Sequence, residues 1–484
     1  MSQYNLHRPQ YHFTPPKMWM NDPNGLVYYK GDYHLFYQYH PHDTVWGPMH
    51  WGHAISRDLI NWQHLPIALQ PDENGMIFSG SIVIDWQDTA GFGKEAMVAI
   101  FTHHKDGNQN QSLAYSNDQG ITWKKYFGNP ILLSPNNPDF RDPKVFWYED
   151  HWVMSLAAGN TILFYISTDL IHWEPSGSFG DGYGSTEGVW ETPDLFKLTV
   201  RNSAETRWVL TVGVGNGHPA GGSGTQYFIG HFDGKSFTSE NAKDAILWAD
   251  FGADYYAAQS WSDEPHGRRL MIGWMNNWQY ANVIPTSGWR GAFTIIRELS
   301  LTKTEERIRL IHQPIAEIQS LRNKNHHWQN ETLIPGTNML ADLQGDAFEI
   351  VSEFQVTGNV DQLGFHVRIG DVERTTIGYS VKERKLFVNR TQSGQGDFHD
   401  GFARTHDADL HCMDHLLRLH IFVDQCSVEV FANDGLLVIT DCIFPSTQST
   451  KLELFVGGDQ AIMNFLDIFE LIPAQYIITE NIGQ

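Results

Sequence analysis

Short apolar stretches separated by polar turns run along the whole chain, and little of it shows the spacing of apolar residues that is typical of helices. The stretches 96–101 (AMVAIF) and 269–274 (RLMIGW) are representative of the part before about residue 300. Stretches of this length between Gly, Asn and Asp turns predict β-strands. We therefore expect an all-β protein.

One polar turn recurs after several of these stretches. It begins with Ser-x-Asp and ends on Trp in 56–62, 116–123 and 167–173, and a weaker copy spans 231–237. Asp in such a turn bonds to its own backbone. Together with the strands around it, the turn marks five units at roughly 22–62, 77–123, 141–173, 190–237 and 255–300. Units of about 40 to 60 residues with four strands are typical of propeller blades, so we expect a five-bladed β-propeller.

The pattern changes after Arg309. The segment 313–337 predicts a linker, and from residue 338 onward strands alternate with hairpin signals such as Asn433-Asp-Gly435. About 145 residues of this kind are typical of a β-sandwich. The expected organisation is a propeller over 1–312, a linker over 313–337 and a sandwich over 338–484, and no acid pair in the sandwich predicts chemistry.

The charge balance excludes some partners. The chain carries 33 basic and 56 acidic residues, a formal net charge of −23. Phosphate groups and anionic membranes bind basic faces, so we expect neither nucleic acid nor a membrane as a partner. The 24 histidines and three cysteines form no metal-ligand spacing such as His-Glu-x-x-His or Cys-x-x-Cys, so we expect no metal and no cofactor.

The start of the chain lacks the basic segment and apolar segment of a secretory signal. Cys412, Cys426 and Cys442 are an odd and sparse set, which does not predict a disulfide framework. Both observations favour a cytoplasmic location, although a secreted chain without its leader would look the same.

Three acids stand just before a predicted strand, at matching positions in the repeat: Asp22, Asp142 and Glu191. The first strand of each propeller blade lines the central axis, so we expect these carboxyl groups to meet at one end of the channel. One carboxylate that attacks an anomeric carbon and another that protonates the leaving oxygen are the chemistry of glycoside hydrolases. Taken singly, each acid could equally cap a turn. Their matching positions in the repeat favour a shared catalytic site.

The residues around these acids resemble the three acidic motifs of glycoside hydrolase family 32, which contains invertases, levanases and exo-inulinases. The motifs are 19–25 (WMNDPNG), 140–143 (FRDP) and 190–194 (WETPD). The resemblance continues in order through nearly the whole chain, at 36–41, 51–54, 78–81, 254–257, 273–282 and 427–435.

The resemblance implies a role for each matching residue. Asp22 would be the nucleophile, Glu191 the general acid/base and Asp142 the stabiliser of the transition state. The residues implied in binding the terminal fructose are Asn21, Gln38, Trp46, Phe78, Ser79, Arg141, Tyr256 and Trp274. Packing between blades is the alternative for Trp46 and Trp274, and a turn bond to backbone is the alternative for Asn21.

The implied function is hydrolysis of terminal β-fructofuranosyl units from sucrose and fructo-oligosaccharides or fructans, by double displacement with retention. The expected partner is therefore a small fructoside or oligosaccharide, and a homo-oligomer is possible. Three alternatives stay open: a fructosyltransferase that passes the same intermediate to another sugar, a sugar-binding propeller without catalysis, and a sialidase-like propeller. The last lacks a convincing tyrosine nucleophile with three arginines.

Thr192 departs from the family pattern, which most often has Cys between the Glu and the Pro of the third motif. A hydroxyl group donates a better hydrogen bond than a thiol. We therefore expect Thr192 to donate to Glu191 and to favour its ionised form.

Overall fold

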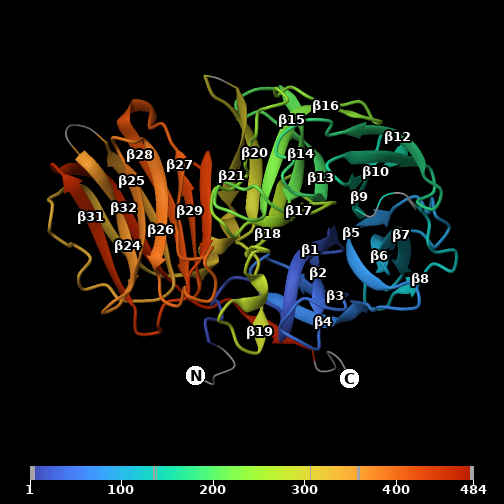
Figure 1. The fold of residues 1–484 in the computed structure, drawn as a ribbon, viewed down its shortest axis with the longest axis horizontal. Coiled ribbons are helices and arrows are strands. Elements are labelled where there is room, and N and C mark those ends of the chain that lie inside the picture. Colours follow the sequence, from blue (N-terminus) through green and yellow to red (C-terminus); the bar gives the residue numbers. More distant parts are fainter. Residues whose placement is uncertain (1–5, 134–136, 138, 306, 357–359, 480–484) are drawn as a thin grey trace.

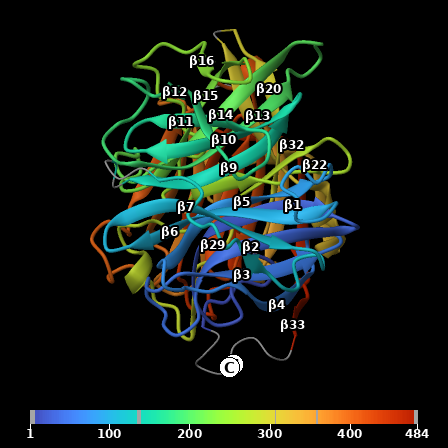
Figure 2. The ribbon, with the colours of Figure 1, turned by 90° about the vertical axis from the view of Figure 1, so that its right-hand side faces the viewer.

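The computed structural model describes residues 6–133, 137, 139–305, 307–356 and 360–479. Two all-β domains lie side by side along the long axis of the molecule, with strands arranged around a centre in one and layered in the other (Figure 1). Seen from the propeller side, the propeller strands lie in front of the sandwich strands (Figure 2). No helix in the described ranges is long and apolar enough to cross a membrane.

The first domain is a five-bladed propeller, as predicted, and each blade is an antiparallel sheet whose first strand faces the centre. The strands, blade by blade, are β1 (Met18–Tyr29), β2 (Asp32–His40), β3 (His50–Ser56) and β4 (Trp62–Leu69); β5 (Met76–Asp85), β6 (Ala96–Lys105), β7 (Asn108–Ser116) and β8 (Lys124–Lys125); β9 (Phe140–Tyr148), β10 (His151–Ala158), β11 (Ile162–Ser167) and β12 (Glu174–Phe179); β13 (Trp190–Thr199), β14 (Thr206–Val214), β15 (Gly224–Phe232) and β16 (Phe237–Ser239); and β17 (Tyr256–Ser260), β18 (Arg269–Trp274), β20 (Arg297–Lys303) and β21 (Ile308–Pro314).

The recurring Ser-x-Asp turn forms the hydrogen bonds expected from its sequence. In the first blade, Asp58 Oδ1 accepts bonds from the backbone N–H groups of Ile60 and Asn61, at 3.0 and 2.8 Å. Asp169 repeats this pattern in the third blade. Because the same side chain closes the same turn in the first and third blades, the repeat in the sequence is a repeat in the structure.

A β-bulge interrupts the first strand of every blade at the same level. The ladder shifts between Met20 and Pro23, Ile77 and Gly80, Arg141 and Lys144, Glu191 and Asp194, and Tyr256 and Gln259. A bulge leaves a residue unpaired and re-aims its side chain. Asp142, Thr192 and Ala257 lie within these bulges in the left-handed region, with φ of 65°, 47° and 51°. The bulges therefore determine which side chains face the channel.

The second domain consists of a six-stranded and a five-stranded antiparallel sheet packed face to face, as predicted for a sandwich. The first sheet contains β22 (Arg322–Leu333), β32 (Ala461–Leu471), β23 (Phe348–Gln355), β28 (Leu416–Asp424), β29 (Ser427–Ala432) and β30 (Leu437–Cys442). The second contains β27 (Thr405–Asp409), β26 (Lys385–Gln392), β25 (Arg374–Ser380), β24 (Val360–Ile369) and β31 (Lys451–Gly458).

The segment 313–337, expected as a linker, differs from that expectation. After the short 3-10 helix η3 (Ala316–Leu321), residues 322–333 form β22, which pairs with β32 at the edge of the sandwich. Its twelve residues are mostly polar and exposed, so no apolar alternation reveals the strand in the sequence. Side-chain contacts across the pair, such as His326 with Glu470 at 2.8 Å, add to its backbone ladder.

Small elements tie the ends of the domains together. β33 (Tyr476–Ile478), within the segment expected as sandwich, pairs in parallel with β4 of the first blade (Figure 2). β19 (Trp289–Arg290) pairs in parallel with β1. Two single-turn 3-10 helices, η2 (Ala281–Val283) and η4 (Met413–His415), also occur in the described part of the chain.

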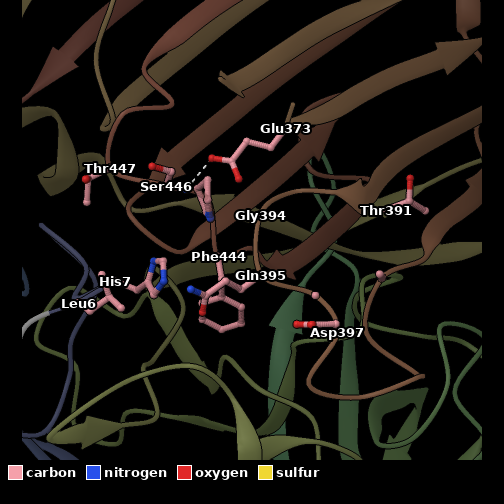
Figure 3. Close-up of a pocket in the computed structure, with 13 residues that line it drawn as sticks. Leu6, His7, Glu373, Thr391, Gly394, Gln395, Asp397, Phe444, Ser446 and Thr447 are labelled. Atoms are coloured by element: carbon pink, nitrogen blue, oxygen red, sulfur yellow. Dashed lines mark hydrogen bonds between the residues drawn. The ribbon is translucent and has the colours of Figure 1, made fainter. Parts of the chain in front are cut away.

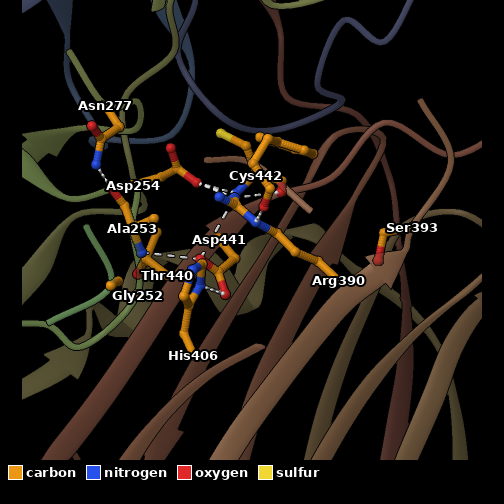
Figure 4. A network of polar contacts seen from close by, with 12 residues as sticks. Gly252, Ala253, Asp254, Asn277, Arg390, Ser393, His406, Thr440, Asp441 and Cys442 are labelled. Atoms are coloured by element: carbon orange, nitrogen blue, oxygen red, sulfur yellow. Dashed lines mark hydrogen bonds and ion pairs between the residues drawn. The ribbon is translucent and has the colours of Figure 1, made fainter. Parts of the chain in front are cut away.

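Buried charges connect the two domains (Figure 4). Arg390 of the sandwich donates to Asp254 of the propeller at 2.6 Å and to the Tyr280 hydroxyl at 3.0 Å. Arg297 of the propeller contacts Glu429 of the sandwich at 2.9 Å. Removing one member of a buried pair leaves the other unpaired at a cost of about 3–5 kcal/mol. The propeller is therefore held against the sandwich in one fixed orientation.

Candidate active site

The bulged first strands bring the three predicted acids together. A cavity of about 170 Å³ opens at the end of the channel where β1, β5, β9 and β13 begin. Its lining residues are Asn21, Asp22, Gln38, Trp46, Phe78, Ser79, Arg141, Asp142, Glu191 and Trp278. Nine of the eleven residues singled out from the sequence therefore line one cavity, which we call the acid pocket.

Asp22 is a buried carboxyl group with two donors. The Asn21 side-chain amide donates to its Oδ1 at 2.9 Å, and the Ser79 hydroxyl donates to its Oδ2 at 2.7 Å. Burial raises the pKa of Asp22, the Ser79 bond lowers it, and the nearby Glu191 raises it; the result is about 6. Asp22 is therefore mainly ionised at neutral pH, in an orientation that two hydrogen bonds define.

Glu191 is held by two side chains from neighbouring blades. Arg141 donates from Nε and Nη2 to Glu191 Oε1, at 3.1 and 3.0 Å. The Tyr256 hydroxyl donates to Glu191 Oε2. Tyr256 does not line the acid pocket itself, although its hydroxyl reaches one of the acids that do. Since a phenol can donate or accept, this contact is compatible with both protonation states of the glutamate.

Asp142 is a buried carboxyl group whose pKa depends on three charged neighbours, Arg141, Glu191 and Asp22. Burial raises its pKa, Arg141 lowers it, and Glu191 and Asp22 raise it; the result is about 7. The backbone N–H of Thr192 donates to Asp142 Oδ2 at 2.9 Å. The neighbouring carboxylates in turn raise the pKa of Arg141, which stays cationic. Burial and the neighbouring carboxylates therefore favour the protonated form of Asp142, and Arg141 opposes them.

Aromatic side chains form the outer wall of the acid pocket. Trp46 is 39% exposed, lies edge-on to Phe78 at 6.1 Å between ring centres, and is held by a bond from its backbone N–H to Asn282 Oδ1 at 2.9 Å. Gln38, deeper in the wall, donates to Asn24 Oδ1 at 2.8 Å. An exposed indole that is fixed through its backbone is a suitable platform for a sugar ring.

Trp274 lies outside the acid pocket. Its side chain packs between blades, which is the alternative named above for this residue. It is fully buried, 6.0 Å from Trp19 and 4.7 Å from Trp278 between ring centres. Trp278, which we did not single out from the sequence, lines the pocket instead. Both tryptophans belong to the same motif (273–282), and only the path of the loop after β18 distinguishes them.

The expectation for Thr192 is wrong in one respect. Its hydroxyl has no hydrogen-bond partner among the described residues and does not reach Glu191. The left-handed conformation of Thr192 in the bulge directs the side chain toward Gly213, where an added Cβ would lie 2.9 Å from Oγ1. Thr192 contacts the acids through its backbone N–H, which bonds Asp142.

A larger cavity, of about 710 Å³, lies on the sandwich side of the molecule and contains none of these acids (Figure 3). Its lining includes Glu373, Gln395, Asp397 and Phe444. Size alone therefore does not single out a candidate; the acid pocket is distinguished by Asp22 and Asp142, two buried carboxyl groups with raised pKa. In the described ranges, no group of three or more His, Cys, Asp or Glu side chains is arranged to hold a metal ion.

Comparison with known families agrees with this geometry. The N-terminal domain of glycosyl hydrolases family 32 matches residues 12–314, and the C-terminal domain of the same family matches 317–470. The chain belongs to glycosyl hydrolase family 32. All three acidic motifs lie within the first matched range, and the second covers most of the sandwich.

Similar proteins extend over nearly the whole chain. A levanase of Bacillus subtilis is 52% identical over 96% of this chain and 70% of its own length. An extracellular exo-inulinase of Aspergillus ficuum is 38% identical over 93% of this chain and 92% of its own. The crystal structure of an exo-inulinase from Aspergillus awamori is 36% identical, covers 98% of this chain and 100% of its own, and superposes with a TM-score of 0.91. A fructofuranosidase from Schwanniomyces occidentalis in complex with fructose, 31% identical over 97% of this chain and 99% of its own, gives a TM-score of 0.89.

Proposed function

We propose that the chain is a retaining, exo-acting β-fructofuranosidase that removes terminal fructosyl units from sucrose, fructo-oligosaccharides and fructans. The observation that carries the proposal is the acid pocket, in which Asp22, Asp142 and Glu191 surround one small cavity behind an aromatic rim. The levanase and exo-inulinase relatives support the class of substrate.

In the first step, Asp22 attacks the anomeric carbon of the terminal fructosyl unit. Burial and its two donors present it as an oriented carboxylate, since its pKa of about 6 lies below neutral pH. The bond from the anomeric carbon to the glycosidic oxygen breaks, and Glu191 gives its proton to that oxygen. The leaving sugar departs, and the fructosyl unit remains on Asp22 as an ester.

In the second step, Glu191 acts as a base. It takes a proton from a water molecule, whose oxygen attacks the anomeric carbon and releases Asp22. Two inversions at one carbon give net retention. Arg141 and Tyr256 hold the Glu191 carboxylate through both steps, and Asp142, in the same cavity, is placed to bond hydroxyl groups of the ring.

The shape of the channel favours attack at chain ends. Directly beneath the acids the channel narrows to a void of about 10 Å³, lined by Pro23, Asn24 and Gln259 among others. A chain cannot thread through such a constriction and must enter from the open side, where the acid pocket of about 170 Å³ has room for roughly one sugar unit.

Product analysis of the purified protein with sucrose, 1-kestose, inulin and levan tests the proposal. We expect free fructose from the first time point and no intermediate oligosaccharides from inulin or levan. Glu191→Gln removes this activity, whereas Glu187→Gln, four residues away on an exposed position, keeps it. Longer oligosaccharides appearing at high sucrose would instead identify a transferase, and turnover by Glu191→Gln at the unmodified rate would refute the assignment of the acid/base.

A further inference from the structure

A second cavity, of about 430 Å³, lies at the other end of the propeller channel. The acid pocket takes residues from the beginning of the central strands, such as Asp142 of β9, whereas this cavity takes residues from their far ends, such as Trp147 of the same strand. At about 3.3 Å per residue, these two positions are roughly 16 Å apart along β9. The narrow void beneath the acids lies between the two cavities. We call this second site the far cavity.

Charged groups form its floor. Lys144 of β9 and Asp194 of β13 are both buried and pair at 3.0 Å, and Lys144 also donates to the Ser260 carbonyl at 2.7 Å. Asp194 Oδ2 accepts the backbone N–H of Ser260 at 2.7 Å, but its Oδ1 is buried without a partner among the described residues. Within the described ranges, the hydrogen bonds of Arg269 go to neutral groups, the Ser260 hydroxyl and the Trp261 carbonyl, and its guanidinium lies over the Phe196 ring. The floor therefore consists of a buried ion pair with the guanidinium of the partly exposed Arg269 beside it.

Tryptophan side chains form the wall. Trp86 is 47% exposed, and its indole N–H donates to Asp263 at 3.1 Å, which fixes the orientation of the ring. Trp147 and Trp208, both half-buried, also line the cavity. Trp147 is fixed in the same manner by a bond to the Glu149 carbonyl at 2.9 Å. Flat apolar faces that stand over a few placed polar groups are the usual composition of a small-ligand site.

We propose that the far cavity is a second binding site for a neutral sugar unit of an oligosaccharide. A sugar ring presents an apolar face to an indole and carries hydroxyl groups that donate and accept. The Arg269 guanidinium donates to one hydroxyl, and the Asp263 carboxylate, which also lines the cavity, accepts from another. An anion would meet the carboxylates of Asp194 and Asp263, and an apolar segment would leave the charged floor without partners.

A sugar site at the far cavity would change how the enzyme acts on polymers. A polymer that is held at the far cavity keeps other chain ends close to the acid pocket, which raises the effective concentration of ends without a new contact at the acids. Sucrose is too small to gain from this effect. The far cavity therefore increases action on polymers selectively.

Calorimetric titration tests the proposal, with 1-kestose and maltotriose as probes. Binding is measured on Glu191→Gln protein, which does not consume 1-kestose. We expect two sites per chain for 1-kestose, and Trp86→Ala added to this protein weakens one of them about three- to tenfold. Trp86→Phe retains part of the binding, and Phe127→Ala, a change at an aromatic residue that is 94% exposed elsewhere, leaves both sites unchanged.

The two probes separate this proposal from the proposed function. Maltotriose that binds once per chain, and only with Trp86 present, supports a neutral-sugar site even if fructosides are not hydrolysed. In otherwise unmodified enzyme, Trp86→Ala keeps kcat/KM on sucrose and lowers it about three- to tenfold on levan or inulin. No binding of maltotriose together with at most one site for 1-kestose, or a maltotriose site that Trp86→Ala leaves intact, overturns the proposal.

Discussion

Replacing Ser79 with Ala changes the ionisation of Asp22 through one hydrogen bond. The Ser79 hydroxyl donates to Asp22 Oδ2 at 2.7 Å, and this bond lowers the pKa of Asp22 against the effect of burial. Ser79→Ala leaves the second donor, Asn21, in place. The pKa of Asp22, about 6 in the unmodified protein, therefore rises. Since the nucleophile attacks as a carboxylate, the acid limb of the pH–rate profile moves to higher pH.

The size of the movement follows from the bond. A hydrogen bond to a charged group contributes about 1.5–3 kcal/mol, and one pKa unit corresponds to about 1.4 kcal/mol, so the limb moves by roughly one to two pH units. For the unmodified enzyme we expect the limb near pH 6 to 7, because Asp142, with a pKa of about 7, titrates in the same cluster as Asp22. Well below the limb, each unit of movement lowers kcat/KM roughly tenfold; well above it, the two enzymes differ much less.

The assay is kcat/KM on sucrose from pH 4 to pH 9, measured by release of fructose. Ser155→Ala is a matched control, since Ser155 is a fully buried serine of the third blade whose hydroxyl has no partner among the described residues. We expect the control to keep the acid limb of the unmodified enzyme. An unmoved limb in Ser79→Ala would refute the reasoning that this bond sets the ionisation of the nucleophile.

Three further predictions concern the domain contact and the aromatic wall. Burial lowers the pKa of His12, but its bonds to the carboxylates of Asp424 and Glu429 outweigh burial and raise the pKa to about 9. Protonated His12 therefore stabilises the folded protein fully below pH 6.5, and this contribution disappears as the pH rises through 9. Urea unfolding should therefore show a loss on the order of 3 kcal/mol between pH 7 and pH 10 that His12→Gln lacks, and equal losses would contradict it. Arg390→Met, which leaves buried carboxylates unpaired, costs about 3–5 kcal/mol in the same measurement, against less than about 1 kcal/mol for Arg418→Met at the surface. Trp278→Ala raises KM for 1-kestose about three- to tenfold, whereas Trp274→Phe lowers the melting temperature and leaves KM unchanged; the reverse pattern would show that our reading of the pocket wall is wrong.

The blades were predictable because their signal is local. Asp58 and Asp169 close the same turn with the same backbone bonds, so the repeat is visible as a spacing in the sequence. The phase of Asp22, Asp142 and Glu191 relative to the strands follows from that repeat. The edge strand at 322–333 has no such signal, because it is mostly exposed and is held by backbone pairing and polar contacts.

The finer details of the site depend on backbone geometry that the sequence does not express. The direction of the Thr192 side chain follows from its left-handed conformation within a bulge, and β-branched residues are rare in that conformation. The choice between Trp274 and Trp278 follows from the loop after β18. The contact from Tyr256 to Glu191 joins the fifth blade to the fourth and depends on the closure of the propeller.

Bulges remove ladder bonds at the level where the acids lie, so other contacts must keep the central strands in register. Just beyond the bulges, Lys144 of β9 pairs with Asp194 of β13 at 3.0 Å. Gln259 of β17 donates to the Thr192 carbonyl of β13 at 2.9 Å, and the Ser81 hydroxyl of β5 donates to the Pro143 carbonyl of β9 at 2.9 Å. Each of these contacts lies one to three residues along its strand from a residue in or beside the acid pocket. These contacts between strands therefore help to set the distances between the carboxyl groups. The Lys144–Asp194 pair of this layer also forms the floor of the far cavity, so one buried ion pair closes off the channel between the two sites.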